Sequence, residues 1–115
     1  MSDCIFCRIA AGEIPATLVG QNDDAVAFRD LNPQAPTHVL VIPRRHVTAA
    51  ADTDTDDGEA LLGRTMRLAV QVARDLGLAE DGYRLVVNNG RDGGQSVFHL
   101  HVHLLGGRRL GWPPG

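Results

Sequence analysis

His99-Leu100-His101-Val102-His103-Leu104-Leu105 decides how this chain folds, because histidines alternate there with aliphatic residues between two glycine pairs. A period of two residues predicts a β-strand, which we place at Val97–Leu105. All three imidazoles would then project from one face of the strand, in steps of about 7 Å. The other face is predicted to join the core, and it carries Phe98, Leu100, Val102 and Leu104.

Four further segments have the composition of strands, and two have helical patterns. The strands are predicted at Thr17–Gly20, Ala25–Arg29, His38–Pro43 and Tyr83–Asn88. Helices are predicted over Cys4–Ala11 and Glu59–Leu76, and the second has apolar residues at three- and four-residue steps: Leu62, Met66, Ala69, Ala73 and Leu76. The acidic run from Asp52 is expected to cap the long helix, and Asn89–Gly94 to form a flexible loop.

Strands on both sides of one long helix predict an α+β fold. We expect a mostly antiparallel five-stranded sheet covered by the long helix, with the short N-terminal helix beside it. The chain has 115 residues, so residues 1–115 are expected to form a single domain. A domain this small has little room to bury Trp112 of the Pro-rich tail, which favours a second subunit as its contact.

Charge and hydropathy exclude several classes of partner. Fourteen acidic residues outnumber eleven basic ones, so the chain lacks the basic surface of a nucleic-acid-binding domain. No apolar segment approaches the ~20 residues of a membrane span, and the N-terminus does not resemble a signal peptide. The sequence therefore predicts a cytoplasmic protein that binds neither nucleic acid nor membrane. All basic residues are arginines, so no lysine nucleophile is available.

Three aligned histidines have two chemical interpretations besides an exposed polar strand face. Alternate histidines on a strand can chelate one catalytic zinc ion with a bound water. Alternatively, one imidazole is a nucleophile that attacks phosphorus and forms a covalent intermediate. The second interpretation is favoured by the glycine-rich segment Asn88–Ser96, because glycines let the backbone approach a phosphate closely and the amide and hydroxyl side chains can donate to it.

Cys4 and Cys7 have the spacing C-x-x-C, which in a cytosolic chain indicates a metal or redox pair rather than a structural disulfide. A thioredoxin-type redox motif follows a strand, and no strand precedes these cysteines. A metal site is therefore the leading interpretation, provided that two more ligands exist.

Several motifs together resemble the histidine triad (HIT) superfamily, and within it the histidine triad nucleotide-binding branch. The segment Gly93–Leu105 resembles the family signature, in which histidines alternate with apolar residues. Cys-Ile-Phe-Cys-Arg-Ile at the start, Asp30–His38 before Val-Ile-Pro, and the Trp-Pro-Pro-Gly ending also resemble that branch. The resemblance implies a homodimeric, purine-nucleotide-binding hydrolase that cleaves the P–N bond of nucleoside 5′-phosphoramidates.

The resemblance also implies roles for individual residues. His101 would be the nucleophile on the α-phosphorus, and His103 would contact the α-phosphate with His38 hydrogen-bonded behind it. Ser96 would help to protonate the leaving amine, and Asp30 would accept the ribose hydroxyls. The rest of the nucleotide site would comprise Phe28, Leu31, Asn88, Gly94 and Gln95.

Some bacterial members of the family with a C-x-x-C motif bind zinc, which by position would use Cys4, Cys7, His46 and His99. A closed Cys₂His₂ set suits structural Zn²⁺, with no metal required for the chemistry. Two other functions remain open: a nucleotide-binding regulatory module, and cleavage of dinucleoside polyphosphates. The Trp-Pro-Pro-Gly ending disfavours the branch that performs the latter.

Overall fold

The computed structural model describes residues 3–115. Its elements, in chain order, are α1 (Ile5–Ala10), β1 (Leu18–Gln21), β2 (Ala25–Arg29), β3 (Thr37–Pro43), the 3₁₀ helix η1 (Ala50–Thr53), α2 (Asp56–Asp75), β4 (Arg84–Val86), α3 (Gly90–Gly93) and β5 (Val102–Gly106). Among these described residues, no helix is long and apolar enough to cross a membrane.

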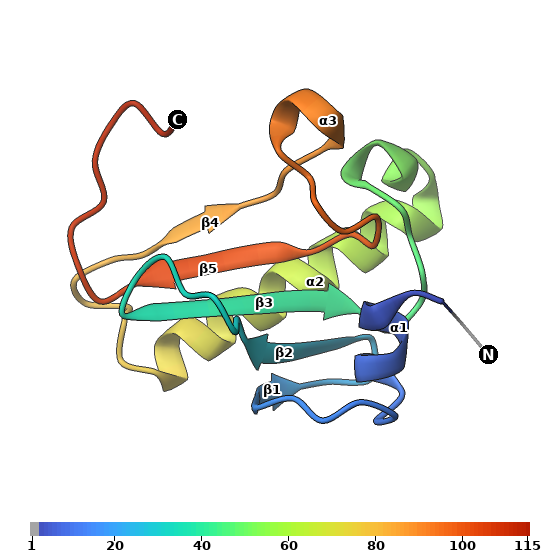
Figure 1. Ribbon diagram of the computed structural model, residues 1–115, viewed down its shortest axis with the longest axis horizontal. Coiled ribbons are helices and arrows are strands. Elements are labelled where there is room, and N and C mark those ends of the chain that lie inside the picture. Colours follow the sequence, from blue (N-terminus) through green and yellow to red (C-terminus); the bar gives the residue numbers. More distant parts are fainter. Residues whose placement is uncertain (1–2) are drawn as a thin grey trace.

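The five strands form one antiparallel sheet in the order β1-β2-β3-β5-β4, which confirms the predicted α+β class. Helix α2 crosses one face of this sheet (Figure 1). Its buried side chains pack on the alanines and valines of β2 and β3 and on Val102 and Leu104 of β5. The central strand β3 is buried on both faces from His38 onward, which explains why its last five residues, Val39–Pro43, are an uninterrupted apolar run.

The opposite face of the sheet carries a second, smaller core. Phe6 of α1 packs there against Val26, Phe28, Leu40 and Ile42. Leu40 is the cross-strand partner of His103, so the triad's last histidine lies on this face, away from α2. Helix α1 sits at the end of the sheet where β3 finishes and β5 begins (Figure 1).

The last strand is shorter than the predicted Val97–Leu105, because it begins only at Val102. Val41 and Val102 form the last pair of the β3–β5 ladder. Beyond them Pro43 has no N–H to donate, and its carbonyl accepts a hydrogen bond from His99 Nε2 at 2.8 Å. His99 and His101 therefore precede the strand, and Phe98 is 56% exposed instead of joining the core.

Local details of three other elements also differ from the prediction. Thr55, not the acidic run, caps α2 by accepting from the Gly58 N–H at 3.0 Å, and the helix begins at Asp56 with acidic residues in its first turn. The buried stripe of α2 is centred one position away from the predicted one, on Leu61, Leu68 and Val72. The segment expected to be a flexible loop contains the one-turn helix α3, and β4 covers only three residues.

Candidate functional site

A cavity of about 290 Å³ lies on the sheet face opposite α2 and is lined by two of the candidate catalytic histidines. His101, His103 and Ser96 line it together with Asp30 and Leu31. The rest of the wall is mostly apolar and comes from α1, β2, β3 and the segments beside them: Ile5, Phe6, Ile9, Ile14, Pro15, Ala16, Thr17, Phe28, Arg29, Leu40 and Val97. An apolar cavity with a few converging polar groups is the usual form of a small-molecule site.

One ring nitrogen of His101 donates a hydrogen bond to the backbone, and the other is left to react with a ligand. Its Nδ1 lies 2.8 Å from the backbone carbonyl oxygen of His99, so Nδ1 must carry the proton that it donates. The neutral ring then has an unprotonated lone pair on Nε2. The ring is 96% buried against the cavity and packs edge-on against Phe6, with ring centroids 5.3 Å apart. This arrangement provides an oriented nucleophile that is largely shielded from water.

His38 and His103 form a hydrogen-bonded relay whose direction is set by the backbone. The Gln34 N–H donates to His38 Nδ1 at 3.0 Å, so the proton of neutral His38 resides on Nε2. His38 Nε2 lies 2.9 Å from His103 Nδ1 and donates to it. His103 consequently carries its own proton on Nε2 and can donate it to an anionic oxygen.

The pKa of His103 is lowered to about 4, chiefly by burial and also by the neighbouring His101 and His38, while Asp30 acts in the opposite sense. Burial also lowers the pKa of His38, against the attraction of Asp30. Both rings are therefore neutral near neutral pH, which is the state that the relay requires.

Stability is expected to fall as pH decreases from about 6.5 towards about 4. In this interval the unfolded chain protonates its histidines while folded His103 stays neutral, so the unfolded state binds more protons. The measurement is Tm as a function of pH for the wild type and His103→Asn. The variant should show the smaller decrease below pH 6.5; an unchanged pH dependence would contradict the assignment of the low pKa to His103.

Asp30 and Leu31 stand at the mouth of the cavity, while Phe28 lies deeper. Asp30 Oδ1 accepts from the Asn32 N–H at 2.7 Å, and Oδ2 lies 3.5 Å from His38 Nε2. Asp30 retains acceptor capacity for a ligand hydroxyl, because each carboxylate oxygen has two lone pairs. Leu31 is fully exposed, whereas Phe28 is buried and contacts Phe6 edge-on.

Three residues that were predicted to belong to the nucleotide site do not line the cavity: Gln95, Gly94 and Asn88. Gln95 is buried, and its side chain braces the preceding loop by donating to the carbonyls of Thr48 and Val97 and accepting from Gly90 N–H. Gly94 ends α3 with a φ of +84°, a conformation that favours glycine. Asn88 is half-buried before α3. These residues shape the loop that delivers Ser96 to the cavity.

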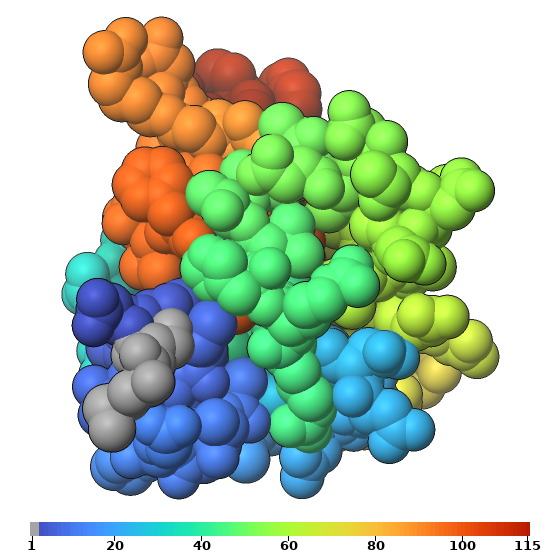
Figure 2. Space-filling model, turned by 90° about the vertical axis from the view of Figure 1, so that its right-hand side faces the viewer, coloured from blue at the N-terminus to red at the C-terminus, as the bar shows by residue number. Residues whose placement is uncertain are grey.

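Cys4, Cys7, His46 and His99 come together at one end of the sheet, with their ligand atoms all within 4.8 Å of one another. Cys4 Sγ and Cys7 Sγ lie 3.3 and 3.4 Å from His99 Nδ1. His46 Nδ1 lies 3.3 Å from Cys7 Sγ and 3.2 Å from His99 Nδ1. Figure 2 shows the corresponding segments meeting on one face, with the N-terminal region in blue beside residues 44–50 in green.

This cluster fits a tetrahedral metal ion. With metal–sulfur bonds of about 2.3 Å and metal–nitrogen bonds of about 2.0–2.1 Å, tetrahedral ligand atoms lie roughly 3.3–3.8 Å apart. His99 donates its Nε2 proton to the Pro43 carbonyl, which leaves Nδ1 as the ligand nitrogen and fixes the ring. The four residues could therefore hold a metal.

A second group, Asp30, His38 and His103, also brings three potential ligand atoms together. It does not suit a metal, because the Gln34 N–H occupies His38 Nδ1 and leaves the proton on Nε2, the atom that would have to bind. The described residues contain no group in which all three triad histidines converge on one point. This geometry disfavours the alternative of a three-histidine catalytic zinc.

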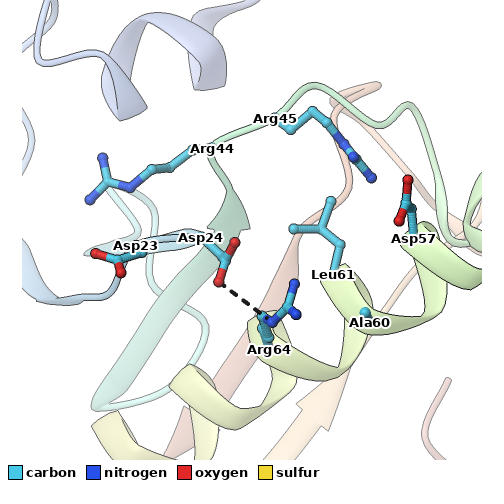
Figure 3. Close-up of a pocket in the computed structure, with 8 residues that line it drawn as sticks. All are labelled: Asp23, Asp24, Arg44, Arg45, Asp57, Ala60, Leu61 and Arg64. Carbon is cyan, nitrogen blue, oxygen red and sulfur yellow. Dashed lines mark ion pairs between the residues drawn. The ribbon is translucent and has the colours of Figure 1, made fainter.

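Another cavity, of about 320 Å³, lies between the β1–β2 turn, the end of β3 and α2 (Figure 3). Its charged side chains are balanced in sign, and Arg64 pairs with Asp24 at 3.6 Å. Arg44 points away and binds the Asn22 and Ala10 carbonyls and the Gln21 side chain. The histidine site is distinguished by the unprotonated Nε2 of His101, and no histidine lines this second cavity.

Sequence reasoning missed the contribution of α1 to the cavity. Ile5, Phe6 and Ile9 lie in the helix predicted over Cys4–Ala11, which was assigned no part in the nucleotide site, yet all three line the cavity beside His101. The i, i+1, i+4 spacing of these residues on a segment with C-x-x-C was the available signal. The amide of Gln34 and the carbonyl of His99 left no signal in the side-chain pattern.

Comparisons with known proteins agree with this geometry. The chain matches the family model described as the HIT domain over residues 11–110. A purine nucleoside phosphoramidase from Escherichia coli K12 is 49% identical over 109 residues, which are 95% of this chain and 91% of that protein. A HIT family hydrolase from Legionella pneumophila Philadelphia 1 has a TM-score of 0.93 and 51% identity, covering 98% of this chain and 100% of its own. A histidine triad protein from Clostridium difficile has a TM-score of 0.91 and 42% identity, covering 96% of each chain.

Proposed function

This chain belongs to the HIT family, and from that premise we propose that it is a nucleoside phosphoramidase with His101 as its nucleophile. The substrate class is a purine nucleoside 5′-phosphoramidate, and residues 1–115 act as one HIT domain. The observation that carries the proposal is the 2.8 Å hydrogen bond from His101 Nδ1 to the His99 carbonyl, which leaves Nε2 unprotonated beside the cavity. The similarity to the E. coli purine nucleoside phosphoramidase supports the same activity.

In the first half of the reaction, the Nε2 lone pair of His101 attacks the α-phosphorus. A P–N bond to His101 forms and the P–N bond to the amine breaks, while the amine takes up a proton from solvent through the Ser96 hydroxyl. Water then attacks the nucleotidyl-histidine and gives up a proton to solvent, which releases the nucleoside monophosphate and restores neutral His101. An imidazole suits both halves, since it is a good nucleophile and a good leaving group near neutral pH.

His103 and His38 act on the charge that develops during both steps. The Nε2–H of His103 donates to a non-bridging phosphate oxygen, and His38 keeps that proton on the side of the substrate by donating to Nδ1. Preorganised donors of this kind stabilise a transition state because they need no reorientation during the reaction. The low pKa of His103, about 4, keeps it a neutral donor rather than a competing cation.

The other residues bind and orient the substrate. Ser96, on the cavity wall, helps to transfer the proton to the leaving amine. Asp30 accepts the ribose hydroxyls, while Phe28 and Leu31 contact the base or sugar. Gln95, Gly94 and Asn88 lie outside the cavity and act by shaping the loop that positions Ser96.

The test is steady-state turnover of a fluorogenic adenosine phosphoramidate beside a diadenosine polyphosphate. A higher kcat/KM for the phosphoramidate is expected. Preference for the diadenosine compound would indicate the polyphosphate-cleaving function. Tight binding of AMP without turnover of either compound would indicate a regulatory nucleotide-binding module.

We also propose that the metal of the Cys4–Cys7–His46–His99 cluster is Zn²⁺. Two thiolates and two imidazoles are a donor set typical of structural zinc, and four protein ligands leave no position for a substrate. When bound, the ion supplies a cross-link between α1 and two distant segments. Cysteines that bind a metal instead of forming disulfides are typical of a reducing compartment, which supports a cytoplasmic location.

A homodimer is the proposed assembly. Strand β4 is a sheet edge, and an edge strand is a template for pairing with another chain. Beside it, Trp112 is 82% exposed, with the Arg84 guanidinium carbon 6.0 Å from its ring centre and Arg84 donating to the Gly111 carbonyl. A second copy would cover both features in a two-fold arrangement.

Light scattering at micromolar concentration is expected to give twice the 12.3 kDa mass of one chain. Trp112→Ala should shift the equilibrium towards single chains, because it removes the largest apolar side chain of the tail. The matched control is Gln71→Ala on the exposed face of α2, which should leave the mass unchanged. A wild-type mass near 12.3 kDa would contradict the dimer.

A further inference from the structure

Helix α1 belongs to two sites at once. Cys4, its N-cap, and Cys7 supply both thiols of the metal cluster. Between and beside them, Ile5, Phe6 and Ile9 line the cavity that holds His101. The helix has only six residues, so metal ligands and cavity wall cannot move independently of each other.

The rest of the chain holds α1 by modest interactions. A helix of six residues does not persist in water by itself, because nucleation is unfavourable and few hydrogen bonds follow it. Phe6 packs into the small core on this face, and Arg44 donates to the Ala10 carbonyl at 3.3 Å. Ile5 is 49% exposed and contributes little burial. The four-residue metal cluster is therefore the strongest available anchor for this wall.

The cluster also touches the nucleophile through His99. The same residue offers Nδ1 to the cluster and its backbone carbonyl to His101 Nδ1. Phe6 contacts both rings edge-on, with centroid distances of 5.9 Å to His99 and 5.3 Å to His101. A displacement of α1 or His99 would thus move a group in direct contact with His101, which lines the cavity.

We infer that the metal cluster controls the affinity of the nucleotide pocket: a metal held by Cys4, Cys7, His46 and His99 fixes α1 as the pocket wall, and its loss weakens nucleotide binding. The inference rests on the proposed function, since it assumes that the cavity receives a nucleotide. The metal remains outside bond making and breaking. Its effect is on the placement of apolar side chains that contact the bound molecule.

The first measurement is the Kd of AMP by calorimetry for protein loaded with Zn²⁺ and for protein stripped by a chelator, below the Tm of both. Stripping is expected to raise Kd by about tenfold or more, the worth of burying one aliphatic side chain. By linkage, saturating AMP must tighten Zn²⁺ binding by the same factor. Amide exchange in α1 should accelerate on stripping, while exchange in α2 stays unchanged.

Variants separate the wall from the metal. Ile5→Ala/Ile9→Ala keeps all four ligands, so it should bind Zn²⁺ normally, bind AMP more weakly, and respond less to stripping than the wild type. If stripped protein does not stay folded, His46→Ala replaces it, because His46 is exposed and lies outside α1. In that variant the Kd of AMP should follow the measured zinc content.

Equal Kd values for AMP in folded loaded and stripped protein would overturn the inference and leave the proposed function intact. An undiminished response to stripping in Ile5→Ala/Ile9→Ala would also overturn it, because the effect would not pass through the wall. Loaded wild type that neither binds AMP nor cleaves the phosphoramidate would overturn the proposed function, and the inference with it.

Discussion

Replacing His101 by alanine is expected to lower kcat for an adenosine phosphoramidate by roughly three powers of ten or more. The reason is that, among the described residues that line the cavity, no other side chain combines an oriented lone pair with shielding from water. His103 cannot substitute, because its Nδ1 accepts from His38 and its Nε2 carries the proton. The Michaelis constant should change far less than kcat, since His101 is one of many residues that line the cavity.

His101→Asn extends this test, because an amide keeps polarity in the cavity but cannot form a stable bond to phosphorus. It should be as inactive as the alanine variant. Gln71→Ala, on the exposed face of α2, serves as the control for expression and folding and should have wild-type kcat. Retention of even about a tenth of kcat in either His101 variant would remove His101 from the role of nucleophile.

The Cys4→Ser/Cys7→Ser double variant is expected to lose bound zinc and to have a Tm lower by on the order of 10 °C. A ligand that binds only the folded chain stabilises it by mass action, and these two thiols tie the N-terminal helix to His46 and His99. Elemental analysis and thermal denaturation of wild type and variant are the measurements. A serine pair preserves the shape of the segment and removes the thiolates.

At saturating substrate and at a temperature where the variant stays folded, kcat should remain within a few-fold of the wild type. The reason is that the ion takes no part in the reaction. Saturating substrate is used because it separates kcat from the nucleotide affinity, which depends on α1. A zinc content near zero in wild type purified without chelators would reject the site. Abolished turnover in a folded, substrate-saturated variant would instead indicate a catalytic metal.

Much of the fold could be predicted from periodicity. Three patterns each show which face of an element is buried against distant parts of the chain: the alternation around His103, the apolar run of β3 and the helical spacing within 59–75. The order of elements and the antiparallel sheet followed from them. Element ends were less predictable, because they depend on single events such as the Thr55 cap and the loss of an N–H at Pro43.

The candidate site was predicted in its residue types but not in its orientation. His99, His101 and His103 were expected to project from one strand face. Instead, backbone carbonyls orient His99 and His101 directly, and a backbone N–H orients His103 only through His38. Three backbone groups determine which ring nitrogen is left for a ligand: the carbonyl of Pro43 for His99, the carbonyl of His99 for His101, and the N–H of Gln34 for the His38–His103 relay. Apart from proline, every residue has the same backbone N–H and carbonyl groups, so no pattern of side chains can reveal where these groups point.

The relay from Gln34 through His38 to His103 ends at a peptide N–H, and this makes it a dead end for protons. A peptide nitrogen can neither accept a second proton nor release its own at ordinary pH, so protons cannot enter or leave the relay through Gln34. Position 34 therefore contributes its backbone rather than its side chain, and it lies between Pro33 and Pro36, which have no N–H to offer. Any residue except proline could supply this donor, so position 34 can vary in sequence while its function stays constant.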